Sequence, residues 1–142
     1  MGLKMIAVTL ALMVLTGASA SAQNTASPPG ARVYIINLKQ GQHVTSPFLV
    51  QFGLSGMGVA PAGVQAEAIG HHHLFIDTDP PVSGVPIPMD DNHRHFFKGQ
   101  TEAIISLPPG PHTLQLVFGD SQHYLHIPPV VSERISIVVD PQ

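Results

Sequence analysis

The stretch His112–Gly119 (HTLQLVFG) is the strongest indicator of the fold. It follows the turn sequence Pro108–Pro111 (PPGP), and its apolar residues then alternate, with Leu114, Leu116 and Phe118 on one side. A strict period of two is typical of a β-strand with one buried face. We therefore predict a strand here whose even-numbered side chains point into the core.

Similar short runs lie on both sides of this strand, separated by turn signals. The chain contains 14 prolines and 13 glycines, which break every periodic run before it reaches the length of a typical helix. The other predicted strands are 32–38, 47–54, 71–77, 93–97, 100–107 and 132–140, with a Gly-rich loop at 55–70. Short strands separated by turn signals at intervals of about ten residues predict an all-β fold. We expect a single immunoglobulin-like antiparallel β-sandwich over residues 32–142.

The N-terminus is typical of a cleaved signal peptide over residues 1–22. A basic start with Lys4 precedes the apolar run Met5–Thr16, and small residues at 18–22 offer cleavage after Ala20 or Ala22. An uncleaved anchor is the alternative, but the run is short for a membrane span. We expect a periplasmic or secreted protein with a flexible leader at 23–31 and no membrane span after processing.

Composition limits the possible partners. About 120 residues remain after processing, enough for one domain. Loss of Lys4 leaves five basic against nine acidic side chains, a net charge of −4 with histidine neutral. Such a chain lacks the basic surface that nucleic acid or an anionic membrane requires. It also contains no cysteine, which excludes disulfides and thiolate metal sites.

Nine histidines are the most informative feature for function. Neutral imidazole is a common ligand of Cu and Zn. Side chains two apart on a strand share a face, so His71 and His73 form one pair and His93 and His95 another. Neighbouring strands could bring both pairs together, and His123 and His126 could reach them from the loop after Gly119. The predicted metal ligands are His71, His73, His93, His95, His123 and His126.

Three histidines have simpler interpretations. His72 has the parity of the apolar residues Leu74 and Ile76, which predicts a buried or supporting position. His112 follows a proline-rich turn and suits a structural hydrogen bond. His43 lies in a turn far from the others and is expected at the surface.

Four blocks, GHHHLFID, HRHFFKGQTE, LPPGPHTLQLVFGD and HYLHIPPVVSERISIVV, resemble a family of small exported bacterial proteins described as a domain of unknown function. The resemblance runs from about Arg32 to Val139 and implies export and a β domain, but no reaction. Some relatives are labelled rod shape-determining proteins. That label does not suit this chain, because it has no apolar run beyond the first 22 residues.

Three classes of function follow. The first is a periplasmic module that binds Cu or Zn for buffering or delivery. The second is a module without metal that contacts an envelope protein, its histidines forming a polar network. The third is a metal-dependent enzyme, with Asp77, Asp79 or Glu102 as acid or base. No nucleophile motif supports catalysis, so an enzyme ranks last.

Overall fold

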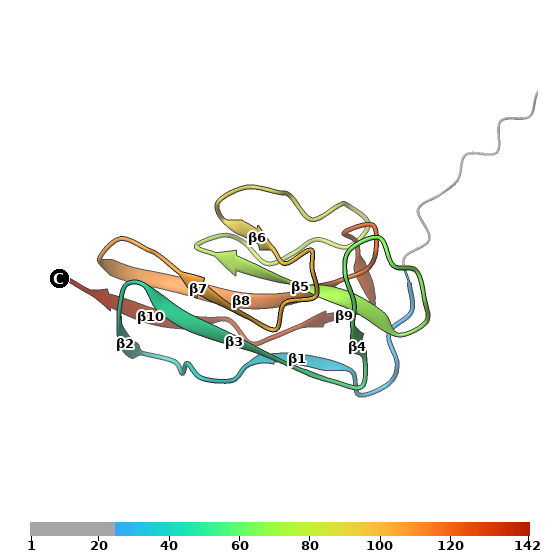
Figure 1. Ribbon diagram of the computed structural model, residues 1–142, viewed down its shortest axis with the longest axis horizontal. Helices are drawn as coiled ribbons and strands as arrows, with labels where there is room; N and C mark the ends of the chain where they lie inside the picture. The colour runs from blue at the N-terminus through green and yellow to red at the C-terminus, as the bar shows by residue number, and fades with distance from the viewer. Residues whose placement is uncertain (1–24) are drawn as a thin grey trace, which may run out of the picture.

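The computed structural model describes residues 25–142, which form ten strands and no helix (Figure 1). The expected signal peptide at 1–22 lies outside these residues. In chain order the strands are β1 (Arg32–Ile35), β2 (Gln42–Thr45), β3 (Phe48–Ser55), β4 (Gly58–Val59), β5 (Ile69–Ile76), β6 (His93–His95), β7 (Glu102–Ile105), β8 (Gly110–Gly119), β9 (Leu125–Val131) and β10 (Ile135–Asp140). The prediction of an all-β fold is confirmed. None of the residues from 25 onwards forms a helix that could cross a membrane.

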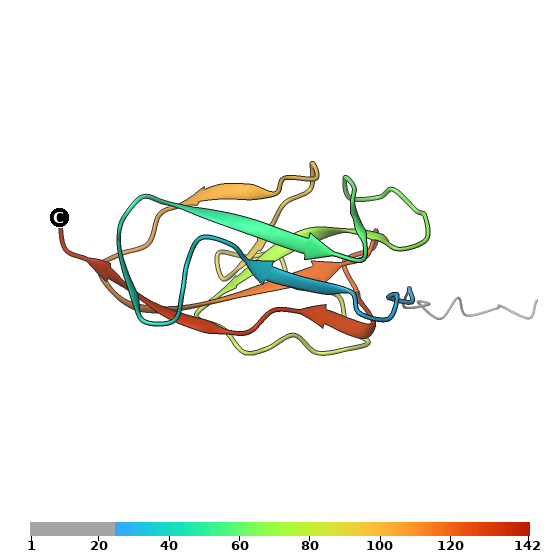
Figure 2. The ribbon, with the colours of Figure 1, turned by 90° about the horizontal axis from the view of Figure 1, so that it is seen from below.

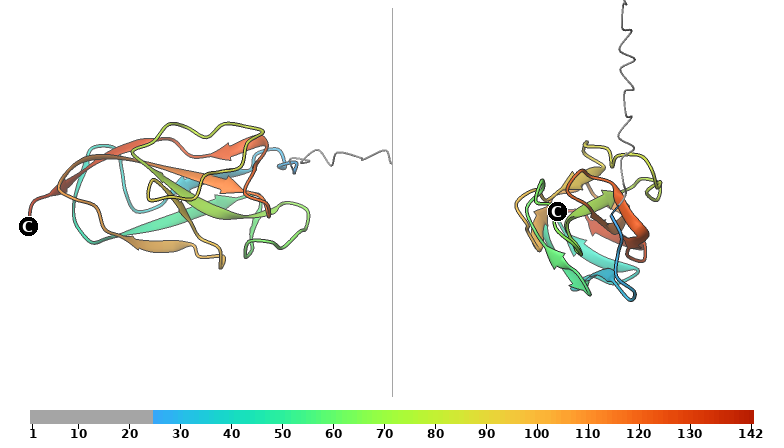
Figure 3. Two further views of the ribbon diagram at one scale, coloured as in Figure 1. Left: turned by 90° about the horizontal axis from the view of Figure 1, so that it is seen from above. Right: turned by 90° about the vertical axis from the view of Figure 1, so that its right-hand side faces the viewer.

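Two sheets enclose the main core. The smaller has the order β1-β3-β7, and the larger runs β2-β10-β8-β5-β4, with β6 also paired to β5 and β9 to β8. Figure 2 shows β1 and β3 side by side, and the end view in Figure 3 shows the strands curling around the interior. The core is apolar, as the periodicity predicted: Leu114, Leu116 and Phe118 of β8 are fully buried, and Ile137 of β10 packs with them.

Some details differ from the antiparallel sandwich that we expected. β2 pairs with β10, and β4 with β5, in parallel. β2 and β9 lie in stretches predicted as turn and loop. β9 contains Pro128 and Pro129, which lack the amide hydrogen that a central strand needs. Among the strands β1–β10 its partner is β8, which it joins across a register irregularity at Phe118/Gly119, and its outer edge meets just a short bridge at Ile127, so it tolerates them. The immunoglobulin-like topology stays a prediction.

A second, thinner layer covers the outer face of the larger sheet. The odd-numbered residues of β5 and β8 point away from the main core, and Phe75 and Val117 pack there with Ile87 and Leu125. Ile87 belongs to the segment between β5 and β6, residues 77–92, drawn in yellow-green and yellow above β5 in Figure 1. This segment is called the outer loop below. The space beneath it contains the candidate site.

The described part of the expected leader is not loose. Ala26 forms a parallel bridge with Ile127 of β9, and the Ser27 amide donates to the Ile127 carbonyl. The Ile127 amide donates in turn to the Thr25 carbonyl. These residues therefore extend the β9 edge instead of forming a free tether.

Candidate metal centre

His71 and His73 lie on the outer face of β5, as their parity predicted. Both side chains are fully buried, because the outer loop and the β8–β9 connection cover them. Opposite them on β8 is Gly119, which pairs with His71. A Cβ atom at Gly119 would lie 2.5 Å from His73 Cε1, which is closer than atoms can approach. The absence of a side chain at Gly119 therefore makes room for the His73 ring.

His95 comes from β6, which pairs antiparallel with β5 so that His95 lies opposite His73. Its Nε2 is 2.6 Å from the Pro88 carbonyl oxygen in the outer loop. A carbonyl only accepts, so Nε2 carries the proton and Nδ1 keeps its lone pair. Hydrogen bonding of the distal ring nitrogen is the usual way in which proteins orient a metal-binding imidazole.

His123 reaches the same place from the β8–β9 connection. Its backbone has a φ of 67°, a left-handed conformation that is uncommon for a residue with a side chain. Buried Asp120 holds this turn: its Oδ1 accepts the amides of Gln122 and Tyr124, each at 2.9 Å. The His123 carbonyl also accepts the Ile87 amide at 2.7 Å. The outer loop thus contacts both His95 and His123.

Together these four imidazoles form a compact group. One potential ligand atom from each of His71, His73, His95 and His123 lies within 4.8 Å of the other three. The ring centroids of His71 and His73 are 4.4 Å apart, as are those of His73 and His95. A tetrahedral Zn ion with bonds of roughly 2.0–2.1 Å places its ligand nitrogens about 3.4 Å apart. Small side-chain movements that bring the four ligand nitrogens to this separation would therefore complete a tetrahedral site.

The buried ring nitrogens in this group lack partners. Within residues 25–142, neither nitrogen of His71 has a hydrogen-bond partner, and the same holds for His95 Nδ1 and His123 Nε2. The His73 nitrogens also lack a close partner, although the Val117 backbone lies near this ring and slightly opposes the lowering of its pKa. Buried polar atoms are almost always satisfied, since an unmade hydrogen bond costs about 1–3 kcal/mol. Several lone pairs left together in one place are chemically suited to a cation.

Burial disfavours the protonated form of three of the four rings. Burial lowers the pKa of His71 to about 4; the nearby His123 and His95 imidazoles add to this effect and Asp120 opposes it. Burial also lowers the pKa of His73 well below its usual value, again reinforced by the neighbouring imidazoles, and it lowers the pKa of His95. Neutral imidazole is the form that binds metal.

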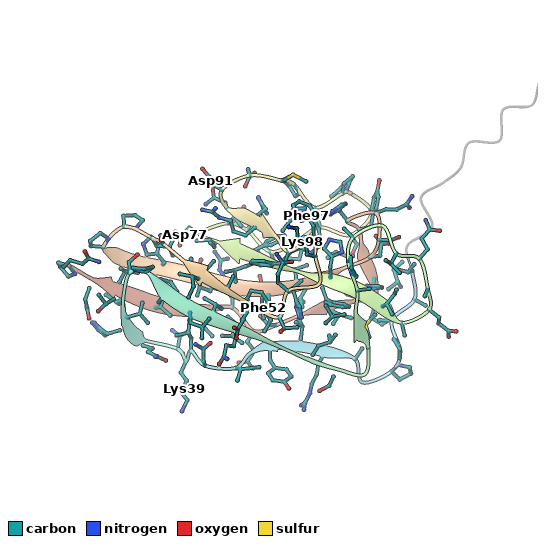
Figure 4. The ribbon with its side chains drawn as sticks, in the orientation of Figure 1. Lys39, Phe52, Asp77, Asp91, Phe97 and Lys98 are labelled. Carbon is teal, nitrogen blue, oxygen red and sulfur yellow. The ribbon has the colours of Figure 1, made fainter. Side chains whose placement is uncertain are left out.

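One side of the group is near solvent. His95 and His123 are only partly buried, and beside both of them lies Phe97, which is 42% exposed. The Phe97 ring centroid is 5.4 Å from that of His95 and 6.0 Å from that of His123. Figure 4 shows Phe97 just beyond β6, whereas Phe52 lies at β3. The side of the group formed by His95 and His123 therefore faces solvent, away from the main core.

Two predicted ligands do not join the group. His93 lies opposite Phe75, not opposite His71, because β6 pairs with β5 only from His73 to Phe75. Its Nδ1 donates to Asp90 Oδ1 at 2.7 Å. His126 follows Leu125 in β9 and so points to the opposite face, where its ring stacks on Phe118 and its Nδ1 contacts Thr25 Oγ1 at 2.9 Å.

The remaining histidines lie where their sequence contexts placed them. His72 is buried in the main core between Phe52 and Phe118. His112 donates to the Asp77 carboxylate at 2.6 Å and to the Pro108 carbonyl at 2.8 Å. Burial by itself would lower the pKa of His112, but these two hydrogen bonds raise it above the usual value. His43 is exposed and contacts Asp140.

Sequence reasoning missed the groups that support the site. The Pro88 carbonyl, the Asp120 carboxylate and the space at Gly119 all act on the four histidines. Only the Gly119–Asp120 pair, directly after the strongest strand, gave a signal for a tight turn. The carboxylates considered for catalysis have other contacts: Asp77 bonds His112, and Glu102 accepts from Gln51.

Comparison with known proteins places the chain in a family but gives it no activity. No curated protein and no solved structure is similar enough to this chain to count as a match. The family described as Domain of unknown function (DUF4399) matches residues 50–140, a range that includes all four clustered histidines. Because the match covers more than half of the sequence, this protein belongs to that family of unknown function.

Proposed function

We propose that this domain binds one transition-metal ion, Cu or Zn, through His71, His73, His95 and His123. The observation that carries the proposal is the group of four converging imidazoles, two of them fully buried, whose facing ring nitrogens lack close hydrogen-bond partners among residues 25–142. With the expected signal peptide, such a site suits buffering or delivery of metal in the periplasm or outside the cell.

The ligand set favours Cu and Zn over other ions. It consists of four imidazoles, whereas Ca²⁺ and Mg²⁺ prefer oxygen ligands. Along the divalent first-row metals, affinity for nitrogen ligands rises to Cu and remains high for Zn. Four protein ligands also fill a tetrahedral coordination sphere, which favours storage over catalysis, because a catalytic ion needs an open position.

The alternative without metal is less consistent with the geometry. A polar network that braces loops would satisfy its own members, since buried networks stabilise only when fully hydrogen-bonded. His95 and His123 do brace the outer loop, through the Pro88 carbonyl and the Ile87 amide. The nitrogens that face one another, however, make no such bonds within the described chain.

The test compares two histidines on one strand. His95→Ala should weaken binding of Zn²⁺ or Cu²⁺ by at least about tenfold, because a removed ligand costs more than 1.4 kcal/mol. His93→Ala, two residues away, should bind metal as the parent does. Isothermal titration gives affinity and stoichiometry, expected to be one ion per chain. Equal loss in both variants, or no binding by the parent protein, would contradict the proposal.

A further inference from the structure

A second site lies beside the metal centre, and none of the four clustered histidines lines it. The outer loop encloses a cavity of about 170 Å³ against the sheet. Phe75 of β5 lines one part of it and His93 of β6 another, while Val82, Val85 and Ile87 line it from the loop. Phe75 and Ile87 are buried, whereas Val82 and Val85 are 66% and 48% exposed. The cavity therefore has an apolar interior and an opening to solvent.

The wall is rigid and poor in polar groups. Four of its residues are prolines: Pro80, Pro81, Pro86 and Pro88. Proline has a fixed φ and no amide hydrogen, so these positions neither donate hydrogen bonds nor move easily. A rigid pocket loses little entropy when a ligand binds. Its size also limits the ligand, because an apolar cavity of about 150 Å³ accepts a benzene ring.

One end of the cavity is polar and is built mainly from acceptors. In a neutral His93 ring, Nδ1 donates to the Asp90 carboxylate at 2.7 Å, which leaves the lone pair on Nε2. The Thr78 hydroxyl donates a long hydrogen bond of 3.5 Å to that Nε2, and Asp79 also lines the cavity. The His93 ring is held edge-on against Phe75, with centroids 4.6 Å apart. Among the described residues around the cavity, none is lysine or arginine.

We infer that this cavity binds a neutral single-ring molecule with one hydroxyl group, of the phenol class. The ring occupies the apolar space next to Phe75 and Val85, and the ligand hydroxyl donates to His93 Nε2 in place of the long hydrogen bond from Thr78. A carboxylate in the same position would meet the acceptor end and Asp79 without a compensating cation, so the site excludes acids of similar size. This inference does not depend on metal binding at the four histidines.

The test uses the metal-free protein and three probes of similar size: phenol, toluene and benzoate. Two-dimensional NMR titration follows the amide signals of Phe75, Val85 and His93. We expect saturable shifts with phenol, with a dissociation constant on the order of 1 mM or lower, and none with benzoate. Toluene has no hydroxyl group, so its binding measures only how well a ring fills the apolar part of the cavity.

Variants separate the polar contact from the apolar space. His93→Phe keeps a ring against Phe75 and should weaken phenol binding about tenfold, but not toluene binding, because only the hydroxyl loses its acceptor. Val85→Trp should block both probes. Thr78→Val, which removes a hydroxyl at almost constant size, provides a second measure if His93→Phe fails to fold. Absence of saturable phenol binding, or equal phenol affinity in the parent, His93→Phe and Thr78→Val proteins, would overturn the inference.

Discussion

His72 shows most clearly how one residue can separate stability from function. It lies between two ligand candidates in sequence, yet its ring points into the main core and contacts Phe52 and Phe118. Within residues 25–142 neither of its ring nitrogens has a hydrogen-bond partner, and burial lowers its pKa to about 4. A buried polar ring without partners destabilises the folded state.

Replacing this ring by an apolar side chain of similar size should therefore stabilise the protein. We expect His72→Leu to raise the free energy of unfolding by about 1–3 kcal/mol, the cost of buried polar groups without partners, measured by denaturant unfolding without metal. Its affinity for Zn²⁺ should equal that of the parent, since His72 faces away from the group of four. A loss of metal affinity in a well-folded His72→Leu protein would show that His72 takes part in the site.

At the scale of elements, the β8–β9 connection determines whether the fourth imidazole is in place. Asp120 accepts two amides of this turn and its own amide donates to the Tyr124 carbonyl, so the conformation of His123 depends on it. Removing the buried carboxylate that accepts these two part-buried amides should cost about 1–3 kcal/mol. The same change would also release a residue whose φ is positive.

Asp120→Ala should therefore reduce both metal affinity and stability, the latter by about 1–3 kcal/mol. Asp120→Asn retains an acceptor oxygen and should restore most of the stability and most of the affinity. Calorimetric titration and thermal unfolding of the two variants separate geometry from charge. If Asp120→Asn binds metal as poorly as Asp120→Ala, the negative charge matters more than the turn.

The elements also show what the sequence could predict and what it could not. Alternation correctly placed His71 and His73 on one face of β5 and His72 on the other. Alternation cannot set the register between two strands, and that register places His95 beside His73 while it moves His93 to Phe75. Because the prolines of β9 argue against a strand, the sequence did not predict one there. The face of the sheet on which His126 lies could therefore not be derived. Long-range pairing, which local pattern does not encode, decided both outcomes.

For the whole molecule, the two layers have separate tasks. The main core closes between the two sheets with apolar side chains and His72, whereas the four clustered histidines and the phenol-sized cavity lie in the outer layer. The larger sheet supports both layers, because β5 and β8 contribute one face to each. Substitutions at partly exposed outer-layer residues such as His95 should therefore affect binding more than folding.

The last prediction concerns acid, and it belongs to the molecule as a whole because residues of both layers contribute. The pKa values of His71 and His72 are lowered to about 4 in the folded state, from 6.5, and the pKa of His73 is also lowered well below 6.5. A histidine whose pKa is lower in the folded than in the unfolded state binds more protons when the chain is unfolded. Its contribution to the free energy of unfolding is therefore complete above pH 6.5 and is lost as pH falls toward 4. Because a tenfold change in proton affinity corresponds to about 1.4 kcal/mol, the loss should be large enough to measure.

His112 acts in the opposite direction. Because the pKa of His112 is raised in the folded state, its contribution to stability is complete at pH values below the pKa of the unfolded state. That contribution is lost as pH rises through the pKa of the folded state. Since three buried histidines oppose this one, we expect the metal-free melting temperature to fall steadily from pH 6.5 to pH 4, and less steeply in His72→Leu. Zn²⁺ at a hundredfold excess over its dissociation constant should add about 2.7 kcal/mol at pH 7.5. Thermal unfolding across this range measures both effects. A melting temperature unchanged between pH 6.5 and pH 4 would mean that these imidazoles are not buried and neutral in solution, and the metal site argued from them would lose its basis.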